Sequence, residues 1–241
     1  MITSTESELT SNTVLSVVVD RDGAVWVGTN EGPVIFDCGG DVFDASRCGG
    51  VRRRVLQDSI GAFLLADQQI NTMAVDGANR KWLGTRNGLF VQSPQGDDQI
   101  AHFTTDNSPI PDDIINALAY DGDQGVMWIG TDKGVITYRT ETTEGSVFHR
   151  SNDVYAFPNP VEPFYTGPIA IKGLVTDANV KITDINGLLV SEMTALGGQA
   201  IWDGNDLEGR RVNSGVYLVF SADQRAFDQP DSFVTKILVL R

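Results

Sequence analysis

The stretch AVWVGT at residues 24–29 indicates the fold of the first half of the chain, because two close variants follow it. They read KWLGT at residues 81–85 and MWIGT at residues 127–131. The three tryptophans lie 56 and 46 residues apart, and periods of about 40–50 residues are typical of propellers or solenoids. The repeated motif residues are Trp26, Gly28, Thr29, Trp82, Gly84, Thr85, Trp128, Gly130 and Thr131.

Each copy divides into short strands separated by turn residues. An apolar run ending in Asp (VLSVVVD, INTMAVD, INALAYD) precedes each Trp, and a Gly follows each Gly-Thr pair. A third strand comes after that Gly, and we expect a fourth at residues 100–104 and 146–150. Four antiparallel strands per repeat predict a propeller blade, with the Trp between neighbouring sheets and Gly-Thr where strands crowd.

These residues resemble the two-component regulator propeller repeat across about residues 11–150, although Ala78 and Asn79 stand where that family has a Gly. Three blades do not close a ring, since propellers usually have about four to eight. No basic and apolar leader begins the chain, so we expect no signal peptide and a C-terminal portion of a larger protein. The formal net charge of −14 argues against nucleic-acid binding, and no apolar run could span a bilayer.

Cysteines and arginines in the long connection after the first copy leave alternatives open. Cys38 and Cys48 could form a disulfide in an oxidising compartment, or they could be two unrelated thiols. Their spacing matches no zinc or redox motif. The run Arg52, Arg53 and Arg54 is the dense basic patch of an acidic chain. It could be a solvated loop without a partner, or it could bind an anion such as a phosphate or an acidic sugar.

A proline-rich boundary then separates a different domain. We expect a partial propeller over residues 1–152 and an Ig-like antiparallel β-sandwich over residues 153–241, so the whole chain is all-β. The second domain resembles the C-terminal domain that sorts proteins through the Bacteroidetes type IX secretion system. The motif residues are Pro158, Asn159, Pro160, Trp202, Asp203, Gly204, Asp206, Gly215, Val216, Tyr217 and Lys236.

Regulator-type blades followed by this domain resemble the PorZ-like family of type IX components. The resemblance implies a cell-surface protein that works with the sortase in the attachment complex, binds anionic lipopolysaccharide and keeps its C-terminal domain. One alternative is an exported cargo protein with a glycan- or protein-binding propeller and a removable sorting domain. Another is the periplasmic propeller of a hybrid two-component sensor.

The sequence offers no candidate for catalysis. It lacks the HExxH and GxSxG motifs and a phosphate-binding glycine loop, and its two histidines, His102 and His149, fall in expected outer strands. The acidic turns at residues 20–23 and 203–206 do not match a calcium loop, and their residues are ordinary in tight turns. We therefore expect no enzyme activity, no cofactor and no metal site.

Overall fold

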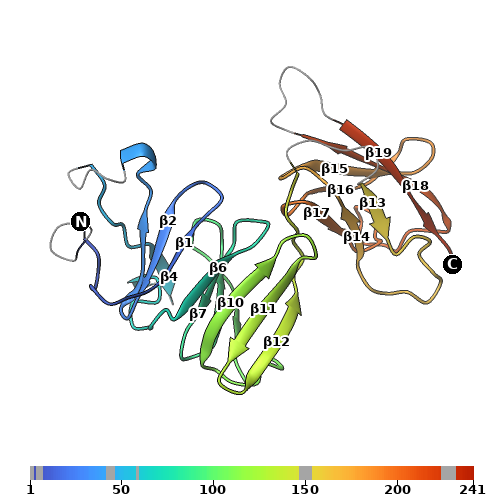
Figure 1. Ribbon diagram of the computed structural model, residues 1–241. Helices are drawn as coiled ribbons and strands as arrows, with labels where there is room; N and C mark the ends of the chain where they lie inside the picture. Colours follow the sequence, from blue (N-terminus) through green and yellow to red (C-terminus); the bar gives the residue numbers. More distant parts are fainter. Residues whose placement is uncertain (1–2, 4–7, 42–46, 58–59, 147–153, 224–231) are drawn as a thin grey trace. The chain divides into compact units, whose positions relative to one another are not determined.

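The computed structural model describes residues 3, 8–41, 47–57, 60–146, 154–223 and 232–241 (Figure 1). The chain forms two compact units. The first holds residues 1–121 and 126–139, and the second holds residues 122–125 and 140–241. The second unit thus begins ahead of the boundary expected at residue 153. His149 and most of the strand expected at residues 146–150 lie outside the described residues.

The first unit consists of antiparallel sheets that follow one another along the chain. The first blade contains β1 (Val14–Val19), β2 (Val25–Thr29) and β3 (Gly32–Phe36). A two-stranded sheet follows, made of β4 (Arg54–Gln57) and β5 (Ile60–Phe63). The second blade contains β6 (Thr72–Val75), β7 (Lys81–Gly84), β8 (Leu89–Gln92) and β9 (Gln99–Phe103). The third contains β10 (Ile115–Asp121), β11 (Val126–Thr131) and β12 (Gly134–Arg139).

The second unit has two antiparallel sheets that share one hydrophobic core. One sheet has the order β13-β14-β17, with β13 (Tyr155–Phe157), β14 (Ile169–Lys172) and β17 (Gln199–Trp202). The other has the order β16-β15-β18-β19, with β15 (Asn179–Thr183), β16 (Leu189–Thr194), β18 (Gly215–Ala222) and β19 (Ser232–Val239). The chain is therefore all-β, and the 3-10 turn η1 (Gly39–Asp41) is the one helical element among the described residues. The finer, Ig-like assignment of this unit stays a prediction.

The spacing between each Asp and its Trp has a direct structural cause. The Asp20 carboxylate accepts hydrogen bonds from the backbone N–H groups of Asp22 and Ala24, at 3.0 and 2.9 Å, and so closes the turn between β1 and β2. Its other oxygen accepts the indole N–H of Trp26 at 3.1 Å. Asp76 repeats this arrangement in the second blade, accepting from Trp82 at 3.0 Å. One carboxylate thus shapes the hairpin and orients the Trp.

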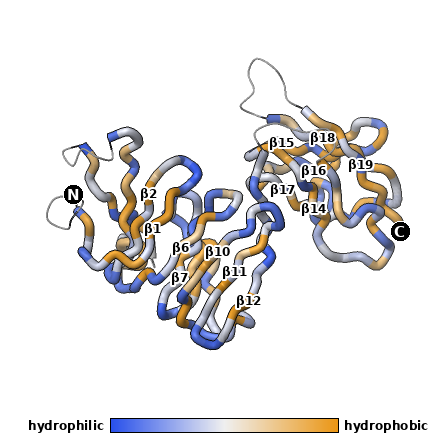
Figure 2. Tube along the Cα trace, viewed as in Figure 1, coloured by the Kyte–Doolittle hydropathy of each residue, from blue (hydrophilic) through white to orange (hydrophobic). Residues whose placement is uncertain are grey.

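Hydrophobic residues concentrate on the strands and hydrophilic residues on the turns, as Figure 2 shows along the trace. The Thr of each Gly-Thr pair stabilises the turn that follows. Its hydroxyl donates to the carbonyl of Gly32, Gly88 or Gly134 at 2.8–2.9 Å. Those three glycines have φ of +87°, +104° and +128°, a backbone region that favours Gly. The Thr is therefore a turn residue.

Candidate functional site

The first two blades pack against their successors through the same set of contacts, which we call the blade seam. Trp26 of the first blade is 1% exposed and lies in one cluster with Met73, Leu83 and Phe90 of the second. Trp82 of the second blade is 2% exposed and clusters with Met127 and Ile129 of the third. The prediction that these two tryptophans fill the space between neighbouring sheets agrees with their burial.

Glycine in the motif permits the close approach of the next blade. A Cβ added to Gly28 would lie 2.8 Å from the side chain of Ile70, and one added to Gly84 would lie 2.7 Å from Ile115. Each Ile also donates its backbone N–H across the seam, Ile70 to the carbonyl of Thr29 and Ile115 to that of Thr85, both at 2.9 Å. The seam is therefore fixed by backbone hydrogen bonds as well as by apolar packing.

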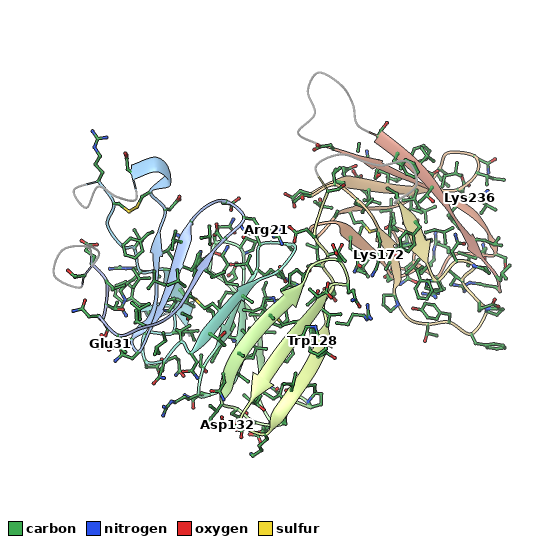
Figure 3. All side chains as sticks on the ribbon, viewed as in Figure 1. Arg21, Glu31, Trp128, Asp132, Lys172 and Lys236 are labelled. Carbon is green, nitrogen blue, oxygen red and sulfur yellow. A yellow bond between two sulfur atoms is a disulfide. The ribbon has the colours of Figure 1, made fainter. Side chains whose placement is uncertain are left out.

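Trp128 differs from its two counterparts, and the expectation that it fills an inter-sheet space is wrong. Its side chain is 49% exposed (Figure 3). It lies on the face of β11 turned away from the second blade, because its neighbours Met127 and Ile129 occupy the opposite face, in the cluster of Trp82. Val135 of β12, paired with Gly130, shares the Trp128 face and is also exposed. The motif predicts the side chain's direction correctly and its burial wrongly.

A buried ion pair crosses the first seam, and no pattern in the sequence predicts it. The Lys81 ammonium lies 2.8 Å from Asp20 and donates to the carbonyls of Asn79 and Pro94, at 2.9 and 2.6 Å. Its side chain is 1% exposed and its nitrogen lies 5.1 Å from the Trp26 ring centroid. From the sequence alone, a Lys next to a motif Trp is expected to face solvent. Its partner Asp20 belongs to the neighbouring blade, so the pattern within one repeat does not reveal the pair.

Burial and ion pairing shift the pKa of Asp20 in opposite directions, and the same holds for the pKa of Lys81. Burial alone would raise the pKa of Asp20, but the hydrogen bond and charge of Lys81, together with the Trp26 N–H, lower it below its ordinary value. Burial lowers the pKa of Lys81, and the Asp20 carboxylate opposes that shift without reversing it. The pair therefore serves structure, since neither group faces an open site.

A cavity of about 600 Å³ lies beside the β4–β5 hairpin. Its lining includes Phe63, three carboxylates (Asp67, Asp97 and Asp98) and the side chain of Gln92. Gln92 is 1% exposed, and neither polar atom of its amide has a hydrogen-bond partner in the part of the chain that the structure describes. The sequence did not single out this cavity, because its walls combine the β4–β5 hairpin with β8 and β9 of the second blade, and no motif links these segments.

The arginine run borders this region, and Arg52 and Arg53 lie in the loop that the sequence suggested. Arg54 begins β4, and the Arg52 and Arg54 guanidinium groups lie 4.2 and 5.3 Å from the centroid of the Phe63 ring. Two cations are thus held on one aromatic ring rather than in a free loop. The nearby carboxylates of the cavity oppose an anion, so any anion contact belongs to the arginines and not to the cavity interior.

Cys38 and Cys48 are joined by a disulfide, with Cα atoms 5.4 Å apart. Cys48 is buried against Val27, Val34 and Phe36, on the face of the first blade opposite Trp26. His102 stacks on Phe90 at 3.8 Å and bonds the Asn87 carbonyl at 2.8 Å, and His149 lies outside the described residues.

In the second unit, the Trp-Asp-Gly motif forms core and turn. Trp202 is buried, its indole N–H donates to the Asn205 carbonyl at 2.8 Å, and its ring lies 5.6 Å from that of Tyr217. The Asp203 and Asp206 carboxylates accept backbone N–H groups of their own turns, at 2.9 Å each. Gly204 has φ of +76° in that turn. These contacts explain the motif as turn chemistry.

Two motifs far apart in sequence meet at the edge of β19. The Asn159 side chain, between Pro158 and Pro160, donates to the Lys236 carbonyl at 2.9 Å and accepts the Leu238 N–H at 3.0 Å. Val161 continues this contact, donating to the Leu238 carbonyl at 2.7 Å. The sequence identified both motifs but not their contact, because nothing in a single sequence pairs residues 77 positions apart.

Lys236 lies on the outer face of the β18–β19 pair, where Figure 3 labels it. Ile237 and Val239 face the core, as the alternation of the strand predicts. The register places Leu218 opposite Lys236, with Val216–Leu238 and Phe220–Val234 as the flanking pairs. Four of these flanking side chains are exposed: Val216, Phe220, Val234 and Leu238. The outcome is an apolar surface with one cation at its centre, which we call the Lys236 face.

No cluster of three or more His, Cys, Asp or Glu residues among the described residues has a metal-binding arrangement. Within the same residues, no helix has the length and apolar character of a membrane span.

Comparison with known proteins agrees with the propeller assignment. The family model of the two component regulator propeller matches residues 8–31. A comparison with curated protein sequences gave no match. Among solved structures, PorZ from Porphyromonas gingivalis, described as an essential bacterial surface component of the type IX secretion system, is 31% identical with a TM-score of 0.61. The match covers 95% of this chain and 30% of PorZ.

The extracellular domain of a putative hybrid two-component system from B. thetaiotaomicron is 13% identical, with a TM-score of 0.42, over 95% of this chain and 50% of that domain. The chain therefore spans less than a third of the length of PorZ and half of the length of the sensor domain. In fold and repeat type, the first unit is similar to PorZ and to the two component regulator propeller.

Proposed function

We propose that this chain is part of a non-enzymatic, exported component of the type IX secretion and attachment machinery at the cell surface. The observation that carries the proposal is the likeness to PorZ, at 31% identity over 95% of the chain. That coverage includes both the blades and the second unit. The partners that we propose are the sortase and other members of the attachment complex, with the second unit acting as a type IX sorting-like domain.

The Lys236 face is the surface that best suits a partner in this role. A cation surrounded by exposed Val216, Phe220 and Leu238 can bind an apolar surface that carries a carboxylate. Ile237 and Val239, by contrast, are buried and serve the core. The candidate recognition residue is therefore Lys236, and the other terminal motif residues are structural.

Replacing Lys236 with Ala tests this role without removing a core residue. The change should leave the melting temperature of the second unit within about 4 °C, because an exposed charge contributes less than about 0.5 kcal/mol. We expect it to reduce recovery of the sortase when the tagged protein is pulled down from a Bacteroidetes strain that carries this gene. Lys172→Ala, on β14 in the other sheet, is the matched control and should leave recovery unchanged. Equal recovery with both variants would contradict the assignment.

Mass spectrometry of surface material then separates a machine component from an exported cargo protein. We expect peptides from beyond Tyr155, including those of β19, in the mature protein. A mature form that ends near Tyr155 would mean that the second unit is a removable signal and that the component proposal is wrong.

Binding of anionic lipopolysaccharide is the part of the proposal that the arginines would carry. Arg52 and Arg54 present guanidinium groups on one ring, and Arg is well suited to bidentate binding of phosphate or carboxylate. The double change Arg52→Gln and Arg54→Gln should weaken binding to anionic lipopolysaccharide and leave binding to a neutral lipopolysaccharide unaffected. If the double variant binds both equally well, the arginines are not the anion contact.

A further inference from the structure

The cavity beside the β4–β5 hairpin has the size of a ligand pocket. Its volume of about 600 Å³ falls within the range of about 300–1,000 Å³ that is typical of small-molecule sites. One wall comes from the hairpin and residues 64–68 after it, and the other comes from β8, β9 and the turn between them. All of these residues belong to the first unit. The cavity is therefore formed within one compact unit.

The Gln92 side chain is the observation that points to a ligand. Phe90, two residues earlier on β8, also lines the cavity, and the alternation of the strand places both side chains on the same face. Gln92 is 1% exposed, and neither Oε1 nor Nε2 has a hydrogen-bond partner among the described residues. Such an amide destabilises the fold, because it has lost its hydration without gaining protein partners. A ligand that bonds both atoms would remove this penalty.

The turn between β8 and β9 is held in place at the edge of the cavity. The Ser93 hydroxyl donates to the Asp97 carboxylate at 2.6 Å. The same oxygen accepts the backbone N–H groups of Asp97 and Asp98, at 3.2 and 3.1 Å. Gly96 packs closely on Trp26, since an added Cβ would lie 2.5 Å from the indole ring. Ligand binding therefore does not require this turn to become ordered.

The charge of the lining favours a cation. Its titratable residues are Asp67, Asp97 and Asp98. Arg53 lies close enough to Asp97 for their charges to interact, but neither Asp67 nor Asp98 has an ion-pair partner among the described residues. The same residues contain no metal-binding cluster of carboxylates. An organic cation therefore suits the lining better than an anion or a coordinated metal ion.

We propose that this cavity binds a small, free hydroxylated amine, such as an amino alcohol or an amino sugar. Hydroxyl groups can donate to Gln92 Oε1 and accept from Nε2, whereas an ammonium group has no acceptor for Nε2. The last torsion of a Gln side chain is soft, so the amide can turn to meet them. The ammonium then lies toward Asp67 and Asp98, and the carbon skeleton contacts Phe90. One such molecule complements the amide, the carboxylates and the apolar wall together.

Isothermal titration calorimetry of the full chain with three sugars of equal ring size tests the ligand class. D-glucosamine, used below the pKa of its amine, carries an ammonium where D-glucose carries a hydroxyl, and D-glucuronate carries a carboxylate. We expect glucosamine to bind at least about tenfold more tightly than glucose, because its hydrogen bonds to carboxylates are charge-assisted. Glucuronate should not bind. Equal binding of glucosamine and glucose, tightest binding of glucuronate, or no binding of glucosamine would each overturn the proposal.

The Gln92→Met variant locates the site and separates a ligand-binding role from a structural one. Met keeps the length of the side chain and removes both unpartnered atoms. The variant should bind glucosamine at least about tenfold more weakly, while its melting temperature stays equal or rises. A residue that only supports the fold would not produce this combination. Unchanged glucosamine binding, or a lower melting temperature, would contradict the assignment of the amide to a ligand.

A carboxylate variant tests where the ammonium lies. Asp98→Asn removes one charge, and it should weaken glucosamine binding about threefold and leave glucose unaffected. Asp106→Asn is the matched control, because Asp106 is also exposed and lies in the turn beyond the other end of β9. It should bind glucosamine like the original chain. Equal effects of the two variants would mean that the overall charge of the chain, and not this cavity, attracts the amine.

Discussion

Replacing Lys81 with Met should destabilise the first unit by about 3 kcal/mol. Lys81 joins two blades, because its ammonium contacts Asp20 of the first and the Asn79 and Pro94 carbonyls of the second. Met has a similar length and keeps the apolar part of the side chain. The change therefore removes the charge and three hydrogen bonds while leaving little empty space.

The expected magnitude follows from what remains after the substitution. Breaking a buried pair by removing one partner typically costs about 3–5 kcal/mol, since the other charge stays buried. The Asp20 carboxylate keeps three N–H donors, from Asp22, Ala24 and Trp26, and these offset part of the loss. The lower end of the range is therefore expected.

Lys133→Met is the matched control. Lys133 pairs with Asp112 at 3.1 Å, but its side chain is 66% exposed, and a solvent-exposed pair contributes about 0–1 kcal/mol. Both variants lose one Lys and one ion pair, so they change net charge equally. The difference between them isolates the effect of burial in the seam.

Urea unfolding of the full chain measures both changes, with tryptophan fluorescence and far-UV circular dichroism recorded together to separate the transitions of the two units. We expect Lys81→Met to lower the midpoint of the first unit's transition and Lys133→Met to leave it nearly unchanged. A cost below about 1 kcal/mol for Lys81→Met would refute the reasoning, because the pair would then add no more than a surface contact.

Three further predictions concern the tryptophans and the pH dependence. Trp82→Ala should cost about 3–5 kcal/mol and Trp128→Ala about 1 kcal/mol or less, measured by the same urea unfolding, since the first is 2% and the second 49% exposed. Trp202→Ala should cost about 3–5 kcal/mol in the second unit alone, and an unaltered second transition would contradict its place in the core. The pKa of Asp20 is lowered in the folded state, so the stability that its ionised form contributes is fully present above the ordinary value of 3.8 and is lost as the pH falls through the folded pKa. The difference in unfolding free energy between the original chain and Lys81→Met should therefore decrease on acidification. An increase in that difference would contradict the prediction.

The repeated motif predicted the fold well because it encodes contacts within one blade. Asp20 and Trp26, six residues apart, bond each other directly, and Thr29 closes the turn to Gly32. Such local contacts leave a pattern that recurs with every copy. Strand directions, turn positions and the buried tryptophans of the first two blades could therefore be read from the sequence alone.

Contacts between repeats were harder to predict. The burial of Lys81 depends on Asp20 in the neighbouring blade, and the exposure of Trp128 depends on what lies beyond the third blade. In the second unit, the bond between Asn159 and β19 joins two motifs that the sequence shows only separately. In each case the deciding partner lies on another element, where periodicity carries no information.

Because the four tryptophans differ in exposure, their intrinsic fluorescence can report on the surroundings of Trp128. Three of the four indoles, those of Trp26, Trp82 and Trp202, are shielded from solvent, and Trp128 alone is half exposed. A small neutral quencher such as acrylamide should therefore reduce one emitting population, the red-shifted one, and leave the other largely unaffected. Anything that covers Trp128 will shift that emission to shorter wavelength without a label.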